Sequence, residues 1–498
     1  MKNNKSGLLI RLVVVLGIFL SLSGGRPEKV QAQTTCTWDG TVDTDWFNAS
    51  NWEGCYDGSA KPVHPGVDHD VVIPAGKSNY PWLTVYQGAV AINSLTINAG
   101  GQITVDEQTG ITATQVINYG LLTIEDEGGH WLRINAPFDN YGTVEYGTEP
   151  SLILYLSGTH TGSFSGRQLS FFDASSKETN TFENGSTITV EVLMVQENHA
   201  INLAGDATAD RVYIENESTV TVTSTATVSF GEIILRGGEY IVDTYTVASG
   251  ETFSGKGIIQ ANLTNAGTVN PGESPGTIAI DGNYTQESSG TLSIEIGGTA
   301  SDTEYDQLVV SGAANLSGTL DVSLINDFSP ALGDSFTVLT YASQTGTFST
   351  VNLPDLPTGL KWDVDYGASA VTLTVRAEEG SISGEVTYIG SHGYNPATVS
   401  LFTDPGESPV HSIEVTSTTG VYPYSITGIP NGTYYIGALM DLNGSHQPES
   451  NEPFAWYSTG PDGVPTAIVI SNETNDVTDI DIQLTDPVSP YYFPLFLH

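Results

Sequence analysis

The sequence is poor in positive charge. It contains 15 Lys and Arg against 57 Asp and Glu, which gives a formal net charge of −42 over 498 residues. A surface of this kind repels nucleic acids and anionic lipids and attracts divalent cations. The composition therefore argues against a nucleic-acid-binding protein. With 39% hydrophobic residues and 54 glycines, it favours an ordered β-rich chain over a disordered one.

The N-terminus lacks an apolar run long enough for a membrane-spanning helix, which needs about 20 residues. The run from Leu12 to Leu22 is shorter than that. It is flanked by cations on one side and small residues on the other, at Lys2, Lys5, Arg11 and Val30-Gln31-Ala32. We therefore predict a signal peptide over residues 1–32 and a secreted or cell-surface protein with no transmembrane span in the mature chain. An uncleaved anchor is the alternative.

Cysteine is nearly absent, since only Cys36 and Cys55 occur. In an exported chain this pair predicts one disulfide that closes a short loop, and two free thiols are the alternative. Three of the seven tryptophans lie around the cysteines, namely Trp38, Trp46 and Trp52. We expect residues 33–75 to form a Cys/Trp module whose rings make a local core that caps the next part of the chain. An exposed ring that stacks on a sugar is the alternative.

Over residues 76–275 a turn phrase that pairs Asn with Gly recurs. Its first copies start 20 and 22 residues apart, at Asn98-Ala99-Gly100, Asn118-Tyr119-Gly120 and Asn140-Tyr141-Gly142. Asn and Gly tolerate the left-handed backbone of a sharp corner, and alternating β-formers follow several copies. One β unit per period predicts an all-β fold, a right-handed parallel β-helix or solenoid, with an antiparallel sandwich array as the alternative.

This repeat shows no recognisable catalytic pattern. Lyases that act on acidic polysaccharides need clustered cations, but the cations here are scattered along the sequence, at Lys77, Arg133, Arg167, Lys177, Arg211, Arg236 and Lys256. Glycosidases need two carboxylates about 5–10 Å apart. Acidic residues are too common here for a pair such as Asp206 and Asp210 to stand out. We therefore predict that the chain is not an enzyme and has no catalytic residues.

The stretch Val269–Gly276 contains Gly272-x-Ser274-x-Gly276, the letters of a hydrolase nucleophile elbow. An elbow uses the N–H of the residue after the serine as an oxyanion donor. That residue is Pro275, which has no N–H. We therefore interpret the stretch as a turn that separates the repeats from a terminal β module of the solenoid over residues 276–376.

A characteristic series of phrases surrounds this turn. It comprises Phe253–Ile259, Asn262–Ile278, Gly282–Gln286, Gly290–Gly298, Tyr305–Val310 and Leu316–Leu320. In this order the phrases resemble the repeat-terminating segment of autotransporter-type bacterial adhesins, over about residues 250–376. The resemblance implies the C-terminal end of an extracellular β-helix, and it brings no catalytic residues with it.

Residues 377–484 carry strand-like runs separated by turns, which is the pattern of a β-sandwich. After a short linker at Ala377–Gly380, the phrases Gly380–Tyr388 and Gly428–Ala438 resemble those of carboxypeptidase regulatory-like (transthyretin-like) domains. The resemblance covers about residues 380–484. It implies an accessory module with a spacer or binding role and no catalysis.

One loop of this domain has the oxygen spacing of an EF-hand calcium site. Its ligands would occupy positions 1, 3, 5, 7, 9 and 12, at Asp441, Asn443, Ser445, Gln447, Glu449 and Glu452. Position 6, where the sharp turn favours glycine, is His446. We predict no cofactor and interpret this stretch as a polar hairpin loop without metal, with calcium as the alternative.

The final segment, residues 485–498, ends in the apolar run Pro490–His498, which is too short to span a membrane. It is either a secretion or surface-retention tail or a strand that docks on a neighbour. As a whole, the sequence predicts a bacterial protein with a structural or adhesive role, whose partner is an extracellular glycan or another cell-surface ligand. The alternatives are a polysaccharide-binding or polysaccharide-cleaving β-helix, and an accessory module of a secreted hydrolase.

Overall fold

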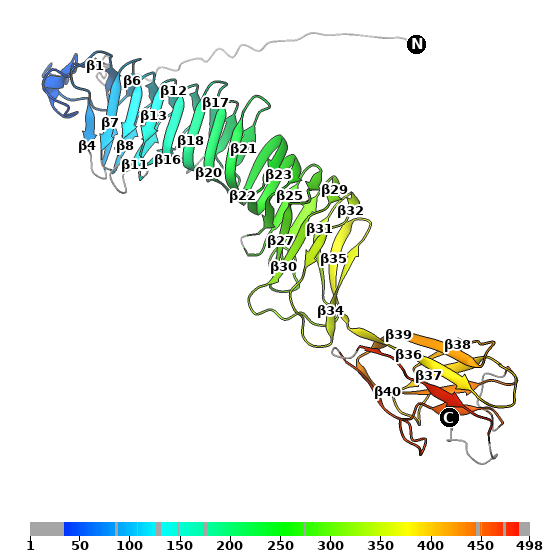
Figure 1. Cartoon of the computed structure of the whole chain (residues 1–498). Coiled ribbons are helices and arrows are strands. Elements are labelled where there is room, and N and C mark those ends of the chain that lie inside the picture. Colours follow the sequence, from blue (N-terminus) through cyan, green and yellow to red (C-terminus); the bar gives the residue numbers. More distant parts are fainter. Residues whose placement is uncertain are drawn as a thin grey trace, which may run out of the picture.

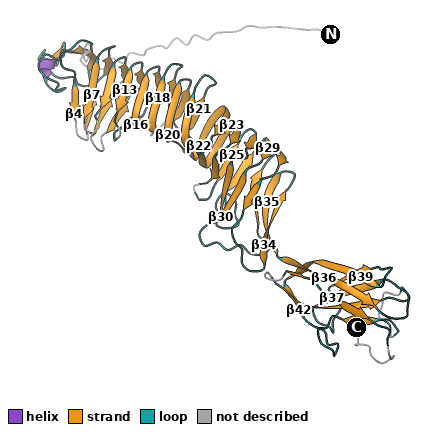
Figure 2. Cartoon of the chain, in the orientation of Figure 1, coloured by secondary structure: helices purple, strands orange, loops and turns teal. Residues whose placement is uncertain are grey.

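The computed structural model describes residues 34–84, 88–106, 108–125, 131–147, 149–172, 177–272, 274–444, 449, 451–471 and 475–487. The predicted signal peptide and the run Pro490–His498 lie outside these residues. Regular structure in the described part is almost entirely β (Figure 2). Its one helix is a 3-10 turn, η1 (Ala49–Asn51), and no helix there is long and apolar enough to cross a membrane.

The N-terminal half is a solenoid whose coils pair in parallel with the next coil along three sheets (Figure 1). Sheet I contains β1 (Thr34–Trp38), β3 (His69–Ile73), β6 (Ser94–Ile97), β9 (Gln115–Asn118), β12 (Phe138–Asn140), β15 (Gly158–His160), β17 (Thr179–Phe182), β19 (Ala200–Leu203) and β21 (Thr219–Val222). The predicted β-solenoid is therefore confirmed.

Sheets II and III alternate with sheet I along the chain. Sheet II contains β4 (Trp82–Thr84), β7 (Gln102–Asp106), β10 (Leu121–Ile124), β13 (Thr143–Tyr146) and the first halves of β16 (Ser163–Phe171), β18 (Thr187–Val195) and β20 (Asp206–Glu215). Sheet III contains β5 (Gly88–Ala91), β8 (Gln108–Thr112), β11 (Trp131–Asn135), β14 (Ser151–Leu154) and the second halves of β16, β18 and β20.

Two asparagines of the turn phrases, Asn118 and Asn140, line an interior corner of the solenoid, whereas Asn98 is exposed. Asn118 and Asn140 are fully buried and in register, and the Nδ2 of Asn118 donates to the Oδ1 of Asn140 at 2.8 Å. Asn118 Nδ2 also donates to the carbonyl of Thr143, and its Oδ1 accepts from the N–H of Gly120. These amides satisfy backbone groups that the corner leaves unpaired inside the core. This requirement explains Asn118 and Asn140; on the preceding coil the same register position is Ile97, and Asn98 follows it outside the core.

Apolar side chains fill the space between the sheets. Strands alternate buried and outward residues, so that Phe138, Phe164 and Phe182 from successive coils meet edge to face around the buried ring of His160. Because His160 is surrounded by these rings, burial lowers its pKa to about 4, and the imidazole is neutral in the folded protein.

Within a single long strand, β22 (Val228–Val247), the pairing of sheet II ends and the pairing of a new sheet begins. Its first residues complete sheet II, its next segments continue sheets III and I, and Thr244–Val247 begin a new sheet, which we call sheet IV. The following strand, β23 (Thr252–Asn265), pairs with β22 along sheets III, I and IV. The replacement of sheet II by sheet IV therefore lies well before Val269–Gly276, where the sequence suggested a transition.

Pairing then continues through Gly276 without a break. Sheet III gains β24 (Thr268–Pro271), β27 (Thr291–Ile296), β30 (Thr319–Leu324) and β33 (Thr350–Asn352). Sheet I gains β25 (Thr277–Ile280), β28 (Gln307–Val310) and β31 (Ser335–Thr340), and sheet IV gains β26 (Tyr284–Gln286), β29 (Ala313–Leu316) and β32 (Ser343–Gly346). The coil length changes after β25, because residues on successive coils now lie about 30 apart in sequence, as Asp281 and Ser311 do.

Both ends of the solenoid are covered. At the N-terminal end β1 pairs antiparallel with β2 (Trp52–Glu53), and at the C-terminal end β31 pairs antiparallel with β35 (Ala370–Ala377), which pairs with β34 (Leu360–Tyr366). Antiparallel caps occupy edges that would otherwise offer unpaired N–H and C=O groups to another chain.

A β-sandwich follows after one residue, Glu378. One sheet contains β36 (Glu379–Tyr388), β39 (Val421–Pro430), β43 (Asp476–Val477) and β44 (Ile482–Leu484). The other contains β37 (Ala397–Phe402), β38 (His411–Val415), β40 (Gly432–Met440), β41 (Phe454–Trp456) and β42 (Ile468–Ile470). These sheets enclose a hydrophobic core separate from that of the solenoid.

We predict that Asn140→Ala lowers the free energy of unfolding by about 1–3 kcal/mol, because the Nδ2 of Asn118 and the carbonyl of Ser163 would both lose a buried partner. Urea unfolding followed by circular dichroism measures the change. Gln115→Ala, which removes an exposed hydrogen bond to Asp139, is the matched control and should change stability by less than about 0.5 kcal/mol. Equal effects of the two substitutions would contradict a structural role for the interior asparagines.

Candidate functional site

The Cys/Trp module contains the predicted disulfide between Cys36 and Cys55. Its three tryptophans are buried, and Trp52 contacts Trp38 and Trp46 edge to face at centroid distances of 4.9 and 4.8 Å. The rings therefore form the core of the N-terminal cap and present no open face to a sugar. In the described chain one group of three potential metal ligands lies close together, Cys36, Cys55 and His69. Its two sulfurs are consumed by the disulfide, so it offers no metal site.

The turn at Gly272–Gly276 is built around a buried carboxylate that the sequence did not single out. Asp306 is fully buried; its Oδ1 accepts from the N–H of Gly276 at 2.9 Å, and its Oδ2 accepts from the N–H of Glu295 at 2.8 Å. Gly272 makes room for it, because a Cβ at this position would lie 2.3 Å from Asp306 Oδ1, and its φ of +100° also favours glycine. Of the two glycines in the elbow-like motif, Gly272 therefore leaves space for the carboxylate of Asp306, and Gly276 donates its N–H to it.

The serine of this motif also has a carboxylate partner. Ser274 Oγ donates to the side chain of Glu295, on the next coil of the solenoid. The strand β25 follows the motif, so it does not have the strand–turn–helix geometry of a nucleophile elbow. Ser274, Glu295 and Asp306 form a polar group that we call the turn cluster.

The pKa of Asp306 is raised to about 7, chiefly by burial. Hydrogen bonds from the N–H groups of Glu295 and Gly276 act against this rise, and the nearby negative charge of Glu295 adds to it. A carboxyl with a pKa near 7 has the proton affinity of a general acid or base. However, Asp306 has no exposed surface and both of its oxygens are engaged by backbone N–H groups. Of the three side chains only Ser274 and Glu295 are placed to meet a substrate.

The candidate calcium loop lies between β40 and β41, and Ser445 and Gln447 lie outside the described residues. Asp441 and Glu452 are both buried. Asp441 Oδ1 accepts from the N–H groups of Asn443 and Gly444, whereas the two oxygens of Glu452 accept from those of Leu442 and Glu449. These bonds close the loop through its own backbone, in the way that a polar hairpin loop without metal would.

The negative charges of this loop nevertheless lie close together. Burial raises the pKa of Glu452, and the charges of Asp441 and Glu449 raise it further against the effect of the two backbone N–H donors. A divalent cation would relieve this repulsion. The calcium site therefore stays an alternative that a titration can decide.

The cations of the solenoid, which are scattered in the sequence, gather on one side of the fold. Arg133, Arg211 and Arg236 project outward from β11, β20 and β22 in sheet III, Lys256 follows on β23, and Arg167 lies where β16 turns from sheet II into sheet III. Sequence reasoning missed this grouping. By contrast, Asp206 lies at the start of β20 and accepts from the N–H of Thr227, whereas Asp210 lies at the corner between the two halves of this strand.

Neither a comparison with protein-family models nor a comparison with curated proteins gives a match to this chain.

We predict that Asp306 makes the protein less stable as pH rises from about 4 to 7. The folded-state pKa of about 7 lies above the unfolded value of 3.8, so the folded state binds more protons throughout this window. The stabilising contribution is therefore complete below pH 3.8 and lost as pH rises through 7, with a slope of at most about 1.4 kcal/mol per pH unit.

Urea unfolding of the wild type and Asp306→Asn at several pH values isolates this contribution. The quantity to compare is the difference in the free energy of unfolding between the two proteins. His160, with its lowered pKa, makes both proteins more stable as pH rises from about 4 to 6.5, and this contribution cancels in the difference. The stability of the wild type relative to the variant should decline up to pH 7 and then level off. A difference that does not vary with pH would contradict this assignment.

A calcium ion bound in this loop should raise the unfolding temperature of the sandwich. If the site binds in the 10⁻⁴–10⁻³ M range of extracellular modules, 10 mM Ca²⁺ should stabilise it by about 1.4–2.7 kcal/mol. Asp441→Asn keeps an acceptor for the N–H groups of Asn443 and Gly444 but removes one charge, so it should abolish the shift. Calorimetry with calcium and with magnesium measures both effects, and an unchanged transition at 10 mM Ca²⁺ would exclude the site.

Proposed function

We propose that this chain is a secreted or cell-surface bacterial protein with a structural and adhesive role, and that it is not an enzyme. One observation supports this most strongly: a single solenoid, capped at both ends, leads into a β-sandwich after one residue, Glu378. Figure 1 shows the solenoid as an elongated body with the sandwich beyond its C-terminal end. An architecture of this kind separates a terminal module from the other end of the chain.

Sequence resemblances add to this proposal. The phrases over residues 250–376 resemble the repeat-terminating segment of autotransporter-type adhesins, and the same residues fold into the last, longer coils and the cap. The phrases over residues 380–484 resemble carboxypeptidase regulatory-like modules, and these residues fold into the sandwich. The disulfide Cys36–Cys55 suits an extracellular protein.

A polysaccharide-cleaving β-helix is the second candidate, and the turn cluster is the observation that favours it. Glu295 and Asp306 are neighbouring carboxyls, one with a pKa near 7, and cleavage of a glycosidic bond uses two carboxyl groups in different protonation states. The complete burial of Asp306 is the reason why we place this candidate second.

An adhesion assay paired with a release assay separates the two candidates. We expect the full chain to bind immobilised extracellular polysaccharides without releasing reducing ends. We also expect Glu295→Gln, which removes one carboxylate of the turn cluster, to bind as the wild type does. Release of reducing ends that Glu295→Gln lowers by a factor of about 100 or more would contradict the adhesive function and establish the hydrolase.

A further inference from the structure

Five of the seven cations between residues 76 and 270 lie on or beside one outer surface of the solenoid. We call this surface the arginine face and define it as the outward side of sheet III from β11 to β23, with the cations Arg133, Arg167, Arg211, Arg236 and Lys256. The whole chain has only 15 Lys and Arg against 57 Asp and Glu. The arginine face therefore gathers five of these seven cations, alongside the carboxylates of Glu191, Asp210, Glu215 and Glu232.

The cations follow the solenoid at a regular interval. Arg133, Arg167 and Arg211 lie on β11, β16 and β20, so one coil without a cation, β14 or β18, separates each from the next. Coils of a parallel sheet are about 4.8 Å apart, so these three cations recur about every 10 Å along the axis. Arg236 and Lys256 then occupy two consecutive coils and are directly in register.

Aromatic and apolar side chains lie between the cations. The residues of the middle column are in register from one coil to the next, in the order Arg133, Ile153, Ser170, Met194, Tyr213 and Ile234, and of these Ser170 is buried. Trp131, Ile153, Met194, Tyr213 and Ile234 are partly exposed. A row of flat, partly apolar side chains between charged groups offers both stacking surfaces and hydrogen-bond donors to a ligand that lies along the axis.

Aromatic rings hold two of the guanidinium groups. The Cζ of Arg133 lies 4.1 Å from the ring centroid of Trp131, and that of Arg236 lies 4.8 Å from the centroid of Tyr213. A guanidinium stacked in this way keeps its edge N–H groups directed away from the ring, where they can bind a carboxylate with two parallel hydrogen bonds. The stacking also reduces the side-chain entropy that binding would remove.

One of the two ion pairs on this face, Arg211–Glu232, is exposed and weak. Arg211 pairs with Glu232 at 3.6 Å, with side chains 59% and 36% exposed, and Arg236 pairs with Glu215 at 3.2 Å. Exposed ion pairs contribute only about 0–1 kcal/mol. A carboxylate of a ligand can therefore replace Glu232 or share its arginine at little cost.

We propose that the arginine face binds an anionic extracellular polysaccharide, with the chain lying along the solenoid axis. The carboxylates of the polysaccharide bind Arg133, Arg167 and Arg211, and its sugar rings contact the aromatic and apolar residues between them. Successive coils are about 4.8 Å apart along the axis, a rise that is close to that of one pyranose unit in an extended polysaccharide, so sugars and coils stay in step over several coils. This inference rests on the proposed adhesive function and names the ligand class and the surface for it.

Binding of the full chain to hyaluronan and to polygalacturonate tests the proposal, with uncharged dextran as the control polymer. We expect both anionic polymers to bind, more weakly as salt rises, and dextran not to bind. The double substitution Arg133→Gln/Arg211→Gln should weaken binding at least about tenfold. Arg133→Lys/Arg211→Lys should restore part of the affinity, because Lys keeps the charge but loses the bidentate geometry.

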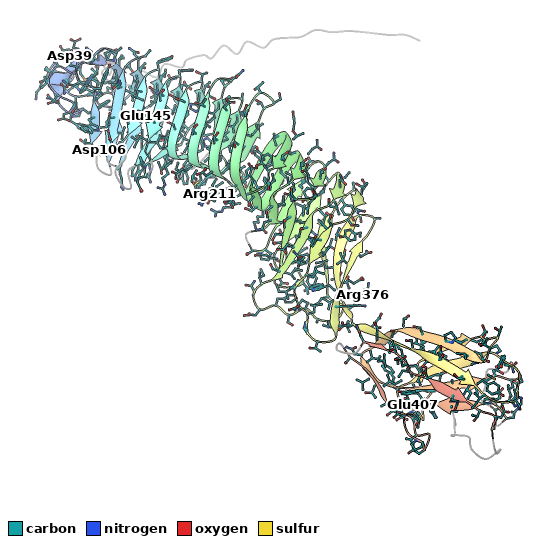
Figure 3. The ribbon with its side chains drawn as sticks, in the orientation of Figure 1. Asp39, Asp106, Glu145, Arg211, Arg376 and Glu407 are labelled. Atoms are coloured by element: carbon teal, nitrogen blue, oxygen red, sulfur yellow. A yellow bond between two sulfur atoms is a disulfide. The ribbon has the colours of Figure 1, made fainter. Side chains whose placement is uncertain are left out.

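Arg376→Gln is the matched control variant. Arg376 is as exposed as Arg211 and pairs with Asp363 in the C-terminal cap, far from Arg211 (Figure 3). It removes one charge outside the arginine face, where each of the two substitutions in the double variant removes one on it, so it should leave binding unchanged. Circular dichroism and the unfolding temperature establish that all variants are folded.

Three results would overturn the proposal: no binding of either anionic polymer at low salt, equal binding of dextran, or equal loss of affinity in Arg376→Gln and in the double variant. Adhesion of the full chain to immobilised polysaccharides separates this failure from that of the proposed function. If the double variant adheres as well as the wild type, the arginine face is excluded and the adhesive function stands. If the wild type itself does not adhere, the adhesive function fails as well.

Discussion

In-register stacking of coils is the interaction on which the rest of this structure depends. Each coil satisfies its backbone N–H and C=O groups on the coils before and after it, and it buries its apolar residues between three sheets that no coil could form alone. The fully buried Asn118 and Asn140 extend the same pairing to side chains at a corner. Because every coil relies on its neighbours, the two ends need caps, which the Trp-rich disulfide module and the hairpin of β34 and β35 provide.

Stacking in register also decides what the outer surface can do. Residues that lie about 20 apart in sequence become neighbours about 4.8 Å apart along a sheet, so a sparse set of side chains can form a dense row. Arg236 and Lys256 show this directly, since they are 20 positions apart in the sequence and paired in β22 and β23. A protein with few cations can therefore still assemble one surface where they are concentrated.

The sequence was sufficient to predict the solenoid because its Asn–Gly turn phrases and the alternating β-formers after them recur at about the length of one coil. The disulfide was also predictable, because only two cysteines exist to form it. The exchange of sheet II for sheet IV within β22 was not predictable. It depends on which neighbour each segment of a continuous β run pairs with, and the alternation of buried and outward residues is similar in all three sheets.

Neither the turn cluster nor the arginine face could be predicted in full from the sequence, for a similar reason. Ser274 was visible as a motif, but Glu295, which accepts from Ser274, lies on β27 of the next coil, and Asp306, which accepts from Gly276, lies just before β28. Nothing in the local sequence links these residues. To predict the arginine face, one must know which residues of each strand point outward, since a shift of one residue in register would move Arg211 from the surface into the core. Site chemistry in a solenoid is thus set by the alignment of coils more than by local motifs.

A crystal structure of the full chain with a bound uronate oligosaccharide would test the role of the arginine face most directly. The oligosaccharide should lie along the outside of sheet III, parallel to the axis, with its carboxylates within hydrogen-bond distance of Arg133 and Arg211 or of their neighbours Arg167 and Arg236. An oligosaccharide bound at the turn cluster or on the β-sandwich, with the arginine face empty, would contradict this role.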